Sequence, residues 1–285
     1  MPDPVLPLAH AATMDHRAHV KASADGAPTG AVYGAIHMHS DFSHDGKDSL
    51  EALRTTCMER GISFVGMTDH AEDLDAKVFD TYRCRCSELS GDGFMLIPGL
   101  EYRFEGFKGL HLLAFGLREW IEPRTPAEFF EQARGRSRMT MLAHPVLARY
   151  VIPEVVLENV DAIEVWNGNY NTRYLPDPKS IRLVQELNRR RPEVVATVGL
   201  DQHDSRNDRE LRVVLPSASP DPLGELKAGR FENLGRTMRL DSRAFLSPAR
   251  LGTLTAVRGV YDVVERAQDR ALHVINRLRS GPLAG

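Results

Sequence analysis

The amino-acid sequence predicts an α/β fold in which a parallel sheet closes into a barrel and a C-terminal helical extension follows. Short apolar runs alternate with helical segments along most of the chain, and this alternation is typical of parallel strands joined by crossover helices. At least six such runs occur within about 200 residues, which favours a barrel over an open sheet. A long helical pattern then closes the chain.

The expected strands are short and apolar almost throughout, as strands buried on both faces usually are. They comprise residues 31–36, 63–68, 94–100, 140–143, 162–165 and 194–200. Most of these runs end in polar residues that can bind metals. The run at 112–115 differs, because its polar residue, His111, comes before it.

Helix signals occupy the segments between the runs. Asp48 and Glu51 resemble a capping pair before the first helix. Thr125 and Asp177 each precede a proline, which is favoured at the first helical position. Apolar residues at helical spacing within residues 247–278 predict the C-terminal helical extension.

The overall composition is ordinary for a packed soluble protein. Apolar residues make up 42% and charged residues 26% of the 285 positions, which excludes a mainly disordered chain. No apolar run approaches the ~18 residues that a membrane-spanning helix requires. Lysine and arginine total 36 against 39 acidic residues, so we do not expect nucleic acid to bind through a broad basic surface.

Three cysteines are too few for a disulfide framework. Cys84 and Cys86 form a C-x-C pair that could bind a metal. No second Cys or His pair lies nearby in the sequence, so we interpret them as ordinary thiols on a helix. Residues 1–30 have no basic start followed by a long apolar core, so no signal peptide is indicated. These features favour a cytoplasmic protein.

We expect the chain to divide into three parts. Residues 1–30 are rich in Ala, Asp, Pro and Gly and show no clear period, so they would form a flexible N-terminal arm. Residues 31–235 carry the alternating pattern and would form the barrel. Residues 236–285 would form the helical extension that packs on the barrel.

Side chains that bind metals gather at the ends of five separate predicted strands. Buried imidazoles and carboxylates are costly unless they are paired or bound to a metal, and the carboxyl ends of barrel strands converge on one mouth. His37 and His39 also have the i, i+2 spacing that points both side chains to one side of a strand. The sequence therefore predicts one shared metal centre. The nine candidate ligands are His37, His39, Asp45, His70, Glu101, His111, His144, Asp201 and His203.

The kinds of ligand narrow the choice of metal. Imidazoles and carboxylates without thiolate favour Zn, Mn or Fe over Mg or Ca. One ion takes about four to six ligands, so nine candidates imply two or three divalent ions that share bridging ligands. Clustered ions lower the pKa of a bridging water and polarise a phosphoryl oxygen. Sites of this kind also hydrolyse amides, so the ligands alone leave the substrate open.

The ordered motifs resemble those of the PHP (polymerase and histidinol phosphatase) superfamily of metal-dependent phosphoesterases. They span residues 32–215 and include His37-Met38-His39, Asp45-Gly46, Thr68-Asp69-His70, Pro98-Gly99-Leu100-Glu101, His111, His144-Pro145 and Asp201-Gln202-His203. The resemblance implies a distorted (βα)7 TIM-like barrel, often with a trinuclear site. Ala35 and Leu200 depart from the family pattern, and neither departure removes a ligand.

The resemblance also implies how the ligands are shared among ions. A first metal would be held by His37, His39, Glu101 and Asp201. Glu101 would bridge to a second metal, held by His111 and His144. A third would be held by Asp45, His70 and His203. The catalytic residues among these would be His37, His39, Glu101, Asp201 and His203.

A phosphate substrate needs cations besides the metals, and arginine suits its bidentate geometry. Four arginines lie just past predicted strand ends, and we expect one or two of them to bind substrate. They are Arg103, Arg149, Arg173 and Arg206. His44 is either a general acid or a solvent-facing neighbour of Asp45.

The leading hypothesis is a phosphoesterase that hydrolyses a small phosphomonoester through a metal-bridging hydroxide. A nuclease or DNA-end-processing phosphodiesterase could use the same metals, but the charge balance and the lack of basic runs argue against it. A non-catalytic, metal-stabilised regulatory module is disfavoured by the complete ligand set. An amidohydrolase of the deacetylase type is a further alternative, because one fold can host several chemistries.

Overall fold

The computed structural model describes the backbone of residues 30–279 and the side chains of residues 30–264. Its strands are β1 (Val32–Met38), β2 (Ile62–Met67), β3 (Asp69–His70), β4 (Met95–Ile97), β5 (Gly99–Arg103), β6 (His111–Phe115), β7 (Met139–Ala143), β8 (Ala162–Asn167), β9 (Val195–Gly199), β10 (Arg212–Leu215), β11 (Glu232–Leu234) and β12 (Arg239–Asp241). Its α-helices are α1 (Leu50–Glu59), α2 (Ala76–Glu88), α3 (Pro126–Ala133), α4 (Glu154–Asn159), α5 (Pro178–Leu187), α6 (Pro222–Lys227) and α7 (Pro248–Arg279). The 3-10 helices η1 (Ala71–Asp73) and η2 (Ser205–Asn207) complete the described elements.

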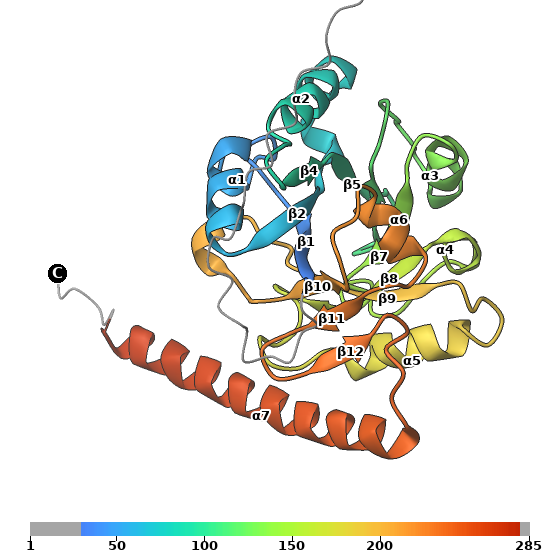
Figure 1. Cartoon of the computed structure of the whole chain (residues 1–285). Helices are drawn as coiled ribbons and strands as arrows, with labels where there is room; N and C mark the ends of the chain where they lie inside the picture. The colour runs from blue at the N-terminus through green and yellow to red at the C-terminus, as the bar shows by residue number, and fades with distance from the viewer. Residues whose placement is uncertain (1–29, 280–285) are drawn as a thin grey trace, which may run out of the picture.

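The strands form two six-stranded sheets, and helices lie around the outside of them (Figure 1). One sheet has the order β12-β11-β10-β1-β2-β4 and the other has the order β3-β5-β6-β7-β8-β9. Every residue of β6, β7, β8 and β9 is buried, as expected for strands covered on both faces. The predicted α/β class is therefore confirmed.

The chain passes directly from one sheet to the other at two places. β2 leads into β3, and β4 leads into β5, across one intervening residue each. β2 pairs with β4 in parallel, and so does β3 with β5. Backbone hydrogen bonds also join β1 to the segment after β9, because Leu200 donates to the Ile36 oxygen (2.9 Å) and His39 donates to the Gln202 oxygen (3.0 Å).

The expectation of a wholly parallel sheet is wrong for β6 and β10. β6 is antiparallel to both β5 and β7, and β10 is antiparallel to β1. The connection from β5 to β6 covers only residues 104–110, and a parallel connection needs a dozen or more residues. The reversal explains why His111 precedes its apolar run instead of following it. His111 starts β6 and pairs with Arg103 and Ala143, which lie at the carboxyl ends of β5 and β7.

The helix caps follow the sequence signals at α3 and α5 and differ at α1. Thr125 and Asp177 accept hydrogen bonds from the first turns of α3 and α5. The cap of α1 is Ser49 instead of Asp48. The Asp48 carboxylate accepts a hydrogen bond from the Ser205 backbone (2.6 Å), so Asp48 makes a contact distant in sequence instead of capping α1.

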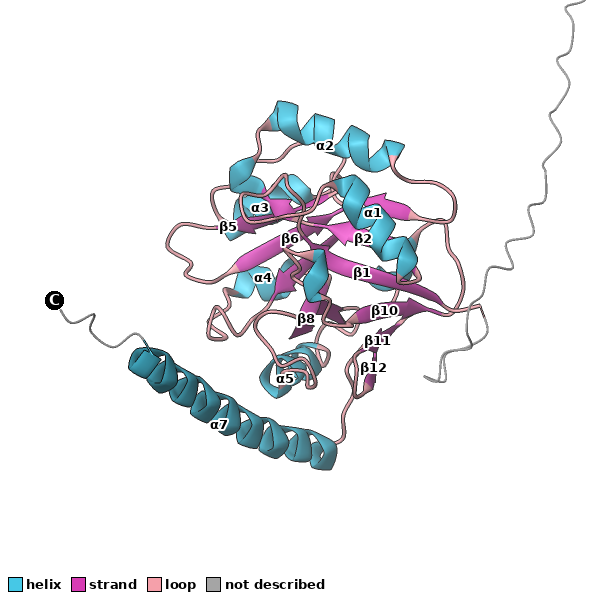
Figure 2. Ribbon diagram, turned by 90° about the vertical axis from the view of Figure 1, so that its left-hand side faces the viewer, coloured by secondary structure: helices cyan, strands magenta, loops and turns pink. Residues whose placement is uncertain are grey.

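The C-terminal part adds two short strands and the predicted long helix. β11 and β12 extend the first sheet in antiparallel fashion. α7 then runs along the outside of α5 (Figure 2), with Leu251 and Leu254 buried at its start. No helix among the described residues is long and apolar enough to cross a bilayer. The arm predicted at residues 1–30 lies outside the described part, apart from Gly30.

The cysteines of the C-x-C motif lie on α2 and have different surroundings. Cys84 is exposed and Cys86 is buried, and burial raises the pKa of the Cys86 thiol. Burial likewise raises the pKa of Cys57 to about 11. The groups of described side chains able to bind a metal contain no cysteine.

Candidate metal centre

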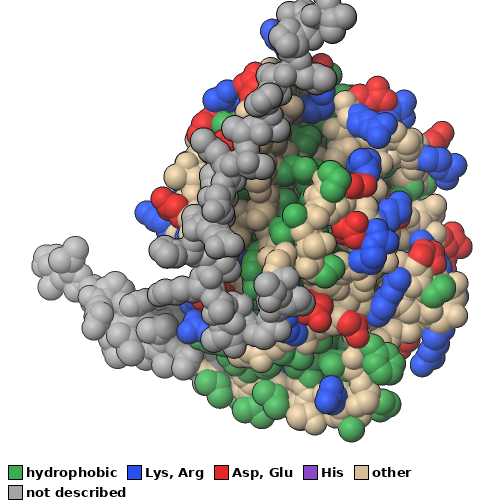
Figure 3. Space-filling view, viewed as in Figure 1, with side chains coloured by type: hydrophobic (Ala, Val, Ile, Leu, Met, Phe, Trp, Pro, Cys, Tyr) green, Lys and Arg blue, Asp and Glu red, His purple; other side chains and the backbone are tan. Residues whose placement is uncertain are grey.

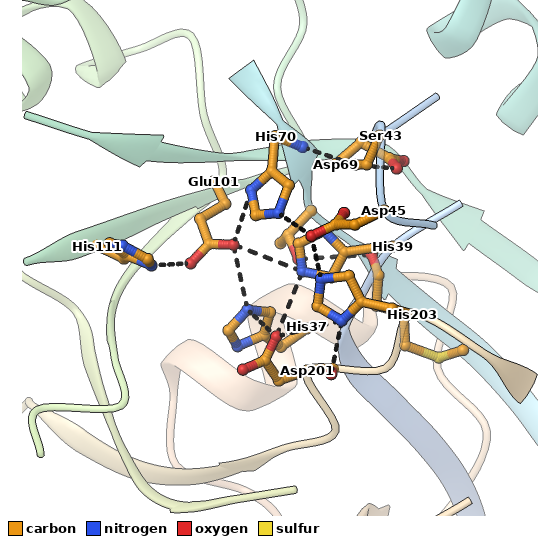
Figure 4. Close-up of polar contacts among 12 residues, drawn as sticks. His37, His39, Ser43, Asp45, Asp69, His70, Glu101, His111, Asp201 and His203 are labelled. Atoms are coloured by element: carbon orange, nitrogen blue, oxygen red, sulfur yellow. Dashed lines mark hydrogen bonds and ion pairs between the residues drawn. The ribbon is translucent and has the colours of Figure 1, made fainter. Parts of the chain in front are cut away.

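The strands and the loops that join them bring all nine candidate ligands together. Each lies within 4 Å of at least one other member of the set. Figure 4 shows Glu101 at the middle of this arrangement, with imidazoles reaching it from several strands. Seven of the nine are buried, and Asp45 and His203 at the rim are more open.

The two oxygens of Glu101 face different groups of histidines. Oε1 lies 2.6 Å from His111 Nδ1 and 3.3 Å from His144 Nε2. Oε2 lies 3.2 Å from His70 Nδ1 and 3.5 Å from His39 Nε2. One carboxylate therefore stands between two sets of imidazoles, which is the geometry that a bridging ligand requires.

Asp201 completes the set around the first pair of histidines. Its Oδ1 lies 3.6 Å from both His37 Nε2 and His39 Nε2. Asp45 plays a similar part at the rim, because its Oδ2 lies 3.3 Å from both His70 Nε2 and His203 Nε2. The two carboxylates thus mark two further places where oxygen and nitrogen donors converge.

The donors fit a transition-metal centre. Nitrogens of His37, His39 and His144 are buried without a hydrogen-bond partner, and so is Oδ1 of Asp45. An unsatisfied buried polar group costs about 1–3 kcal/mol, and a bound cation would satisfy such groups. Four overlapping sets of described side chains place their donor atoms within 4.8 Å of one another. Nitrogen and carboxylate donors without thiolate suit Zn, Mn or Fe.

Three of the ligand positions have an unusual backbone. His37, His144 and Asp201 have φ of 61°, 24° and 48°, the left-handed region that non-glycine residues rarely adopt. The pairing of β1 with β2 shifts register between Ile36 and Met38, so a bulge, and not simple strand alternation, turns His37 toward the centre. Backbone strain of this kind clusters at functional sites.

The surroundings lower the pKa of two buried carboxylates of the centre, Glu101 and Asp201. Burial alone would raise the pKa of Glu101, but hydrogen bonds from His111, His144 and two other histidines hold it well below its usual value. Burial likewise opposes the charged form of Asp201, but His37, His39 and His144 together outweigh burial and lower the pKa of Asp201. Burial also opposes a charged His37, but Asp201 and nearby glutamates raise its pKa.

Two of the predicted substrate residues lie beside the centre. Arg103 Nη2 lies 3.2 Å from His70 Nε2, and its Nη1 lies 3.2 Å from Glu72. His44 has a 59% exposed side chain, and its Nδ1 lies 2.7 Å from Asp73. Arg103 and His44 therefore line the solvent side of the ligand cluster.

The other three arginines lie apart from the ligands. Arg173 pairs with Glu210 (3.1 Å), and Arg206, with an 80% exposed side chain, pairs with Asp204 (2.6 Å). Arg149 is exposed on a left-handed backbone. Among the described contacts, none of these arginines has a hydrogen bond or ion pair with the nine ligands.

Sequence reasoning missed two buried acids that brace the centre. Asp69 accepts hydrogen bonds from the Ser40 backbone (2.7 Å) and from the Ser43 hydroxyl (2.8 Å), which fixes the loop that leads to Asp45. Glu164 contacts His37 from inside β8. A charged residue within the apolar run at 162–165 was the available signal for Glu164.

Comparisons with known proteins agree with this geometry. Residues 35–145 match the family model of the PHP domain. The Probable histidinol-phosphatase of Thermotoga maritima is 23% identical over 201 residues, which cover 60% of this chain and 84% of that protein.

A solved structure shares the fold at low sequence identity. A two-domain protein from Bacteroides vulgatus, containing a predicted PHP-like metal-dependent phosphoesterase, aligns with a TM-score of 0.55 at 20% identity. The alignment covers 72% of this chain and 65% of that protein, so this chain spans less than two thirds of its length. PsfC from Pseudomonas syringae aligns over 81% of this chain and 98% of its own, with 13% identity and a TM-score of 0.45.

Proposed function

We propose that this chain, which carries a PHP domain, is a metal-dependent phosphoesterase that hydrolyses a small phosphomonoester. The observation that carries the proposal is the position of Glu101 between two sets of imidazoles, 2.6 Å from His111 on one side and 3.2 Å from His70 on the other. A carboxylate in that position can neutralise two cations at once. A multinuclear centre that activates water and binds phosphate follows from this arrangement.

Two or three divalent ions of Zn, Mn or Fe would occupy the centre. A first would be held by His37, His39, Glu101 and Asp201; a second by Glu101, His111 and His144; a third by Asp45, His70 and His203. Bound there, such ions would lower the pKa of coordinated water and polarise a phosphoryl oxygen.

Arg103 and His44 would handle the substrate on the solvent side. The Arg103 guanidinium is held by Glu72 (3.2 Å), and in this proposal it would donate hydrogen bonds to phosphate oxygens. Asp73 engages Nδ1 of His44 at 2.7 Å, so Nε2 is left to carry a proton to the leaving oxygen. His44 would thus act as the general acid.

We also interpret the two sheets as one distorted (βα)7 TIM-like barrel. The direct passage of β2 into β3 and of β4 into β5 supports a continuous wall. The hydrogen bonds from Leu200 and His39 across to β1 and the segment after β9 support its closure. Such a barrel would account for the convergence of the ligands, because strand carboxyl ends meet at one mouth.

The surface charge favours a small substrate over DNA. The net charge is −3, and basic and acidic side chains are interspersed on the face shown in Figure 3. A nuclease that tracks a phosphate backbone would be expected to carry a continuous basic surface.

A hydrolysis screen tests the proposal. The protein is stripped of metal, reloaded separately with Mn and Zn, and assayed on phosphomonoesters, phosphodiesters, short DNA and acetylated amides. We expect metal-dependent release of phosphate from monoesters, loss of that activity in Glu101→Gln and its retention in Glu131→Gln, a matched change at an exposed position of α3. Preferential cleavage of DNA or amides would replace the proposal, and a metal-loaded but inert protein would favour the regulatory module.

A further inference from the structure

Glu164 is a buried acid outside the proposed ligand set. It lies within β8, and only 1% of its surface is exposed. Its Oε1 lies 3.0 Å from His37 Nδ1. Its Oε2 accepts hydrogen bonds from the His144 backbone (2.7 Å) and from Asn167 Nδ2 (2.8 Å). One carboxylate therefore contacts a ligand of the first proposed metal and a ligand of the second.

The fold reserves space for this carboxylate. A Cβ added to Gly199, on the adjacent strand β9, would lie 1.6 Å from Glu164 Oε1. Any side chain at residue 199 would therefore displace the carboxylate from His37. Asn167 extends the network, because its Nδ2 also lies 3.3 Å from Asp201 Oδ2.

The chemistry of the contacts defines what Glu164 does. An ionised carboxylate only accepts hydrogen bonds, and the His144 amide and the Asn167 amide group are donors. His37 Nδ1 must then carry a hydrogen when it faces Oε1. The other ring nitrogen, Nε2, points at Glu101 and Asp201 (3.7 and 3.6 Å) and has no hydrogen-bond partner.

We propose that Glu164 is a positioning residue that fixes His37 in the tautomer with Nδ1 protonated, so that Nε2 is free to bind a metal, and that it also locks the backbone of His144. The inference rests on the proposed function in one respect, that His37 is a metal ligand. Carboxylates that orient ligating histidines typically contribute roughly 10- to 100-fold to metal affinity. Glu164 braces two ligand groups, so both ions should depend on it.

Glu164→Gln tests the inference because it keeps the size of the side chain and adds a donor. If the new amide nitrogen faces His37, Nδ1 must accept and Nε2 is protonated. If it faces the other way, it meets two donors, those of His144 and Asn167, so the first orientation is favoured. Either orientation disrupts the arrangement. Gly199→Ala is the companion variant, since it displaces the carboxylate without changing its charge, and Glu131→Gln is the surface control.

Three measurements are made on these variants. Chelator competition gives the zinc affinity, and elemental analysis at saturating zinc gives the number of ions bound. The tautomer of His37 is read by ¹⁵N NMR of the metal-free protein, at a pH where the His37 ring is neutral. We expect Glu164→Gln and Gly199→Ala to bind zinc roughly 10- to 100-fold more weakly at unchanged stoichiometry, and Glu164→Gln to lose the Nδ1-protonated tautomer.

Other outcomes would overturn the inference in distinct ways. Wild-type zinc affinity and an unchanged tautomer in Glu164→Gln would remove the positioning role. Loss of a whole ion at saturating zinc would make Glu164 a direct ligand instead. Circular dichroism identifies a variant that fails to fold, and the other variant then decides. None of these readouts depends on hydrolysis, so failure of the proposed phosphoesterase activity would be recognised separately.

Discussion

Glu101→Gln is the substitution that separates a bridging carboxylate from an ordinary buried acid. The change keeps the shape of the side chain and removes the charge that lies between His111 and His144 on one side and His70 and His39 on the other. An amide can present only one oxygen, so at least one set of imidazoles would face an NH2 group.

The structure sets the scale of the effect. A hydrogen bond or ligand contact to a charged group contributes about 1.5–3 kcal/mol, which corresponds to roughly 10- to 150-fold in an equilibrium constant. Glu101 makes one such contact toward each of two proposed ions. Turnover at limiting metal should therefore fall by roughly 10²- to 10⁴-fold, comparable to the loss of a strong electrostatic contact in other active sites.

The assay is steady-state kinetics on a phosphomonoester, with metal content measured on the same sample. We expect a large fall in kcat together with a lower content of both ions, and wild-type values of both in Glu131→Gln. Near-normal kcat in Glu101→Gln with its metals retained would refute the bridging role and would require a different source of the nucleophile.

Three further predictions follow from the same geometry. Metal removal by a chelator should lower the melting temperature, because ions that bind only the folded state stabilise it. Elemental analysis of the reloaded protein should find at least two ions per chain. A single ion at saturation would refute the multinuclear centre. Arg103→Ala should raise KM roughly tenfold or more, with less effect on kcat, since it would lose a bidentate phosphate contact, whereas Arg206→Ala, at a position paired with Asp204, should change neither constant. His44→Gln should lower kcat by roughly 10²- to 10⁴-fold for an alkyl phosphate and far less for p-nitrophenyl phosphate, whose leaving group needs no proton; an equal loss on both substrates would remove the general-acid role.

The location of the candidate centre could be predicted from the sequence because a simple geometric rule governs it. Apolar runs mark buried strands, and the residues that follow parallel strands meet at one edge. Asp201 follows β9 and obeys this rule, and His70 ends β3, whereas Glu101 lies inside β5 and still reaches the same edge. His111 does not obey the rule, and only the antiparallel pairing of β6 explains why it reaches the same edge.

Other features depend on contacts that no local pattern encodes. Asp48 has a side chain that could cap a helix, but its carboxylate accepts a hydrogen bond from the backbone of Ser205, far along the chain. Ser49 caps α1 instead. Among the four arginines with similar positions after strands, tertiary geometry places Arg103 beside His70 and pairs Arg173 with Glu210. The local sequence cannot distinguish these four arginines from one another. Their partners depend on the paths of loops, and the local sequence does not determine those paths.

The strained ligands and the missed acid belong to one physical arrangement. His37, His144 and Asp201 adopt left-handed backbone conformations, which cost about 1–3 kcal/mol each. Glu164 lies 3.0 Å from the His37 ring and accepts a hydrogen bond from the His144 backbone, and hydrogen bonds to a charged group contribute about 1.5–3 kcal/mol each. Asn167 connects the same carboxylate to Asp201. These contacts are of the size needed to offset the strain, and they act before any ion is bound. The donors are therefore held in position by the protein itself, so that little reorganisation remains for the ions to impose.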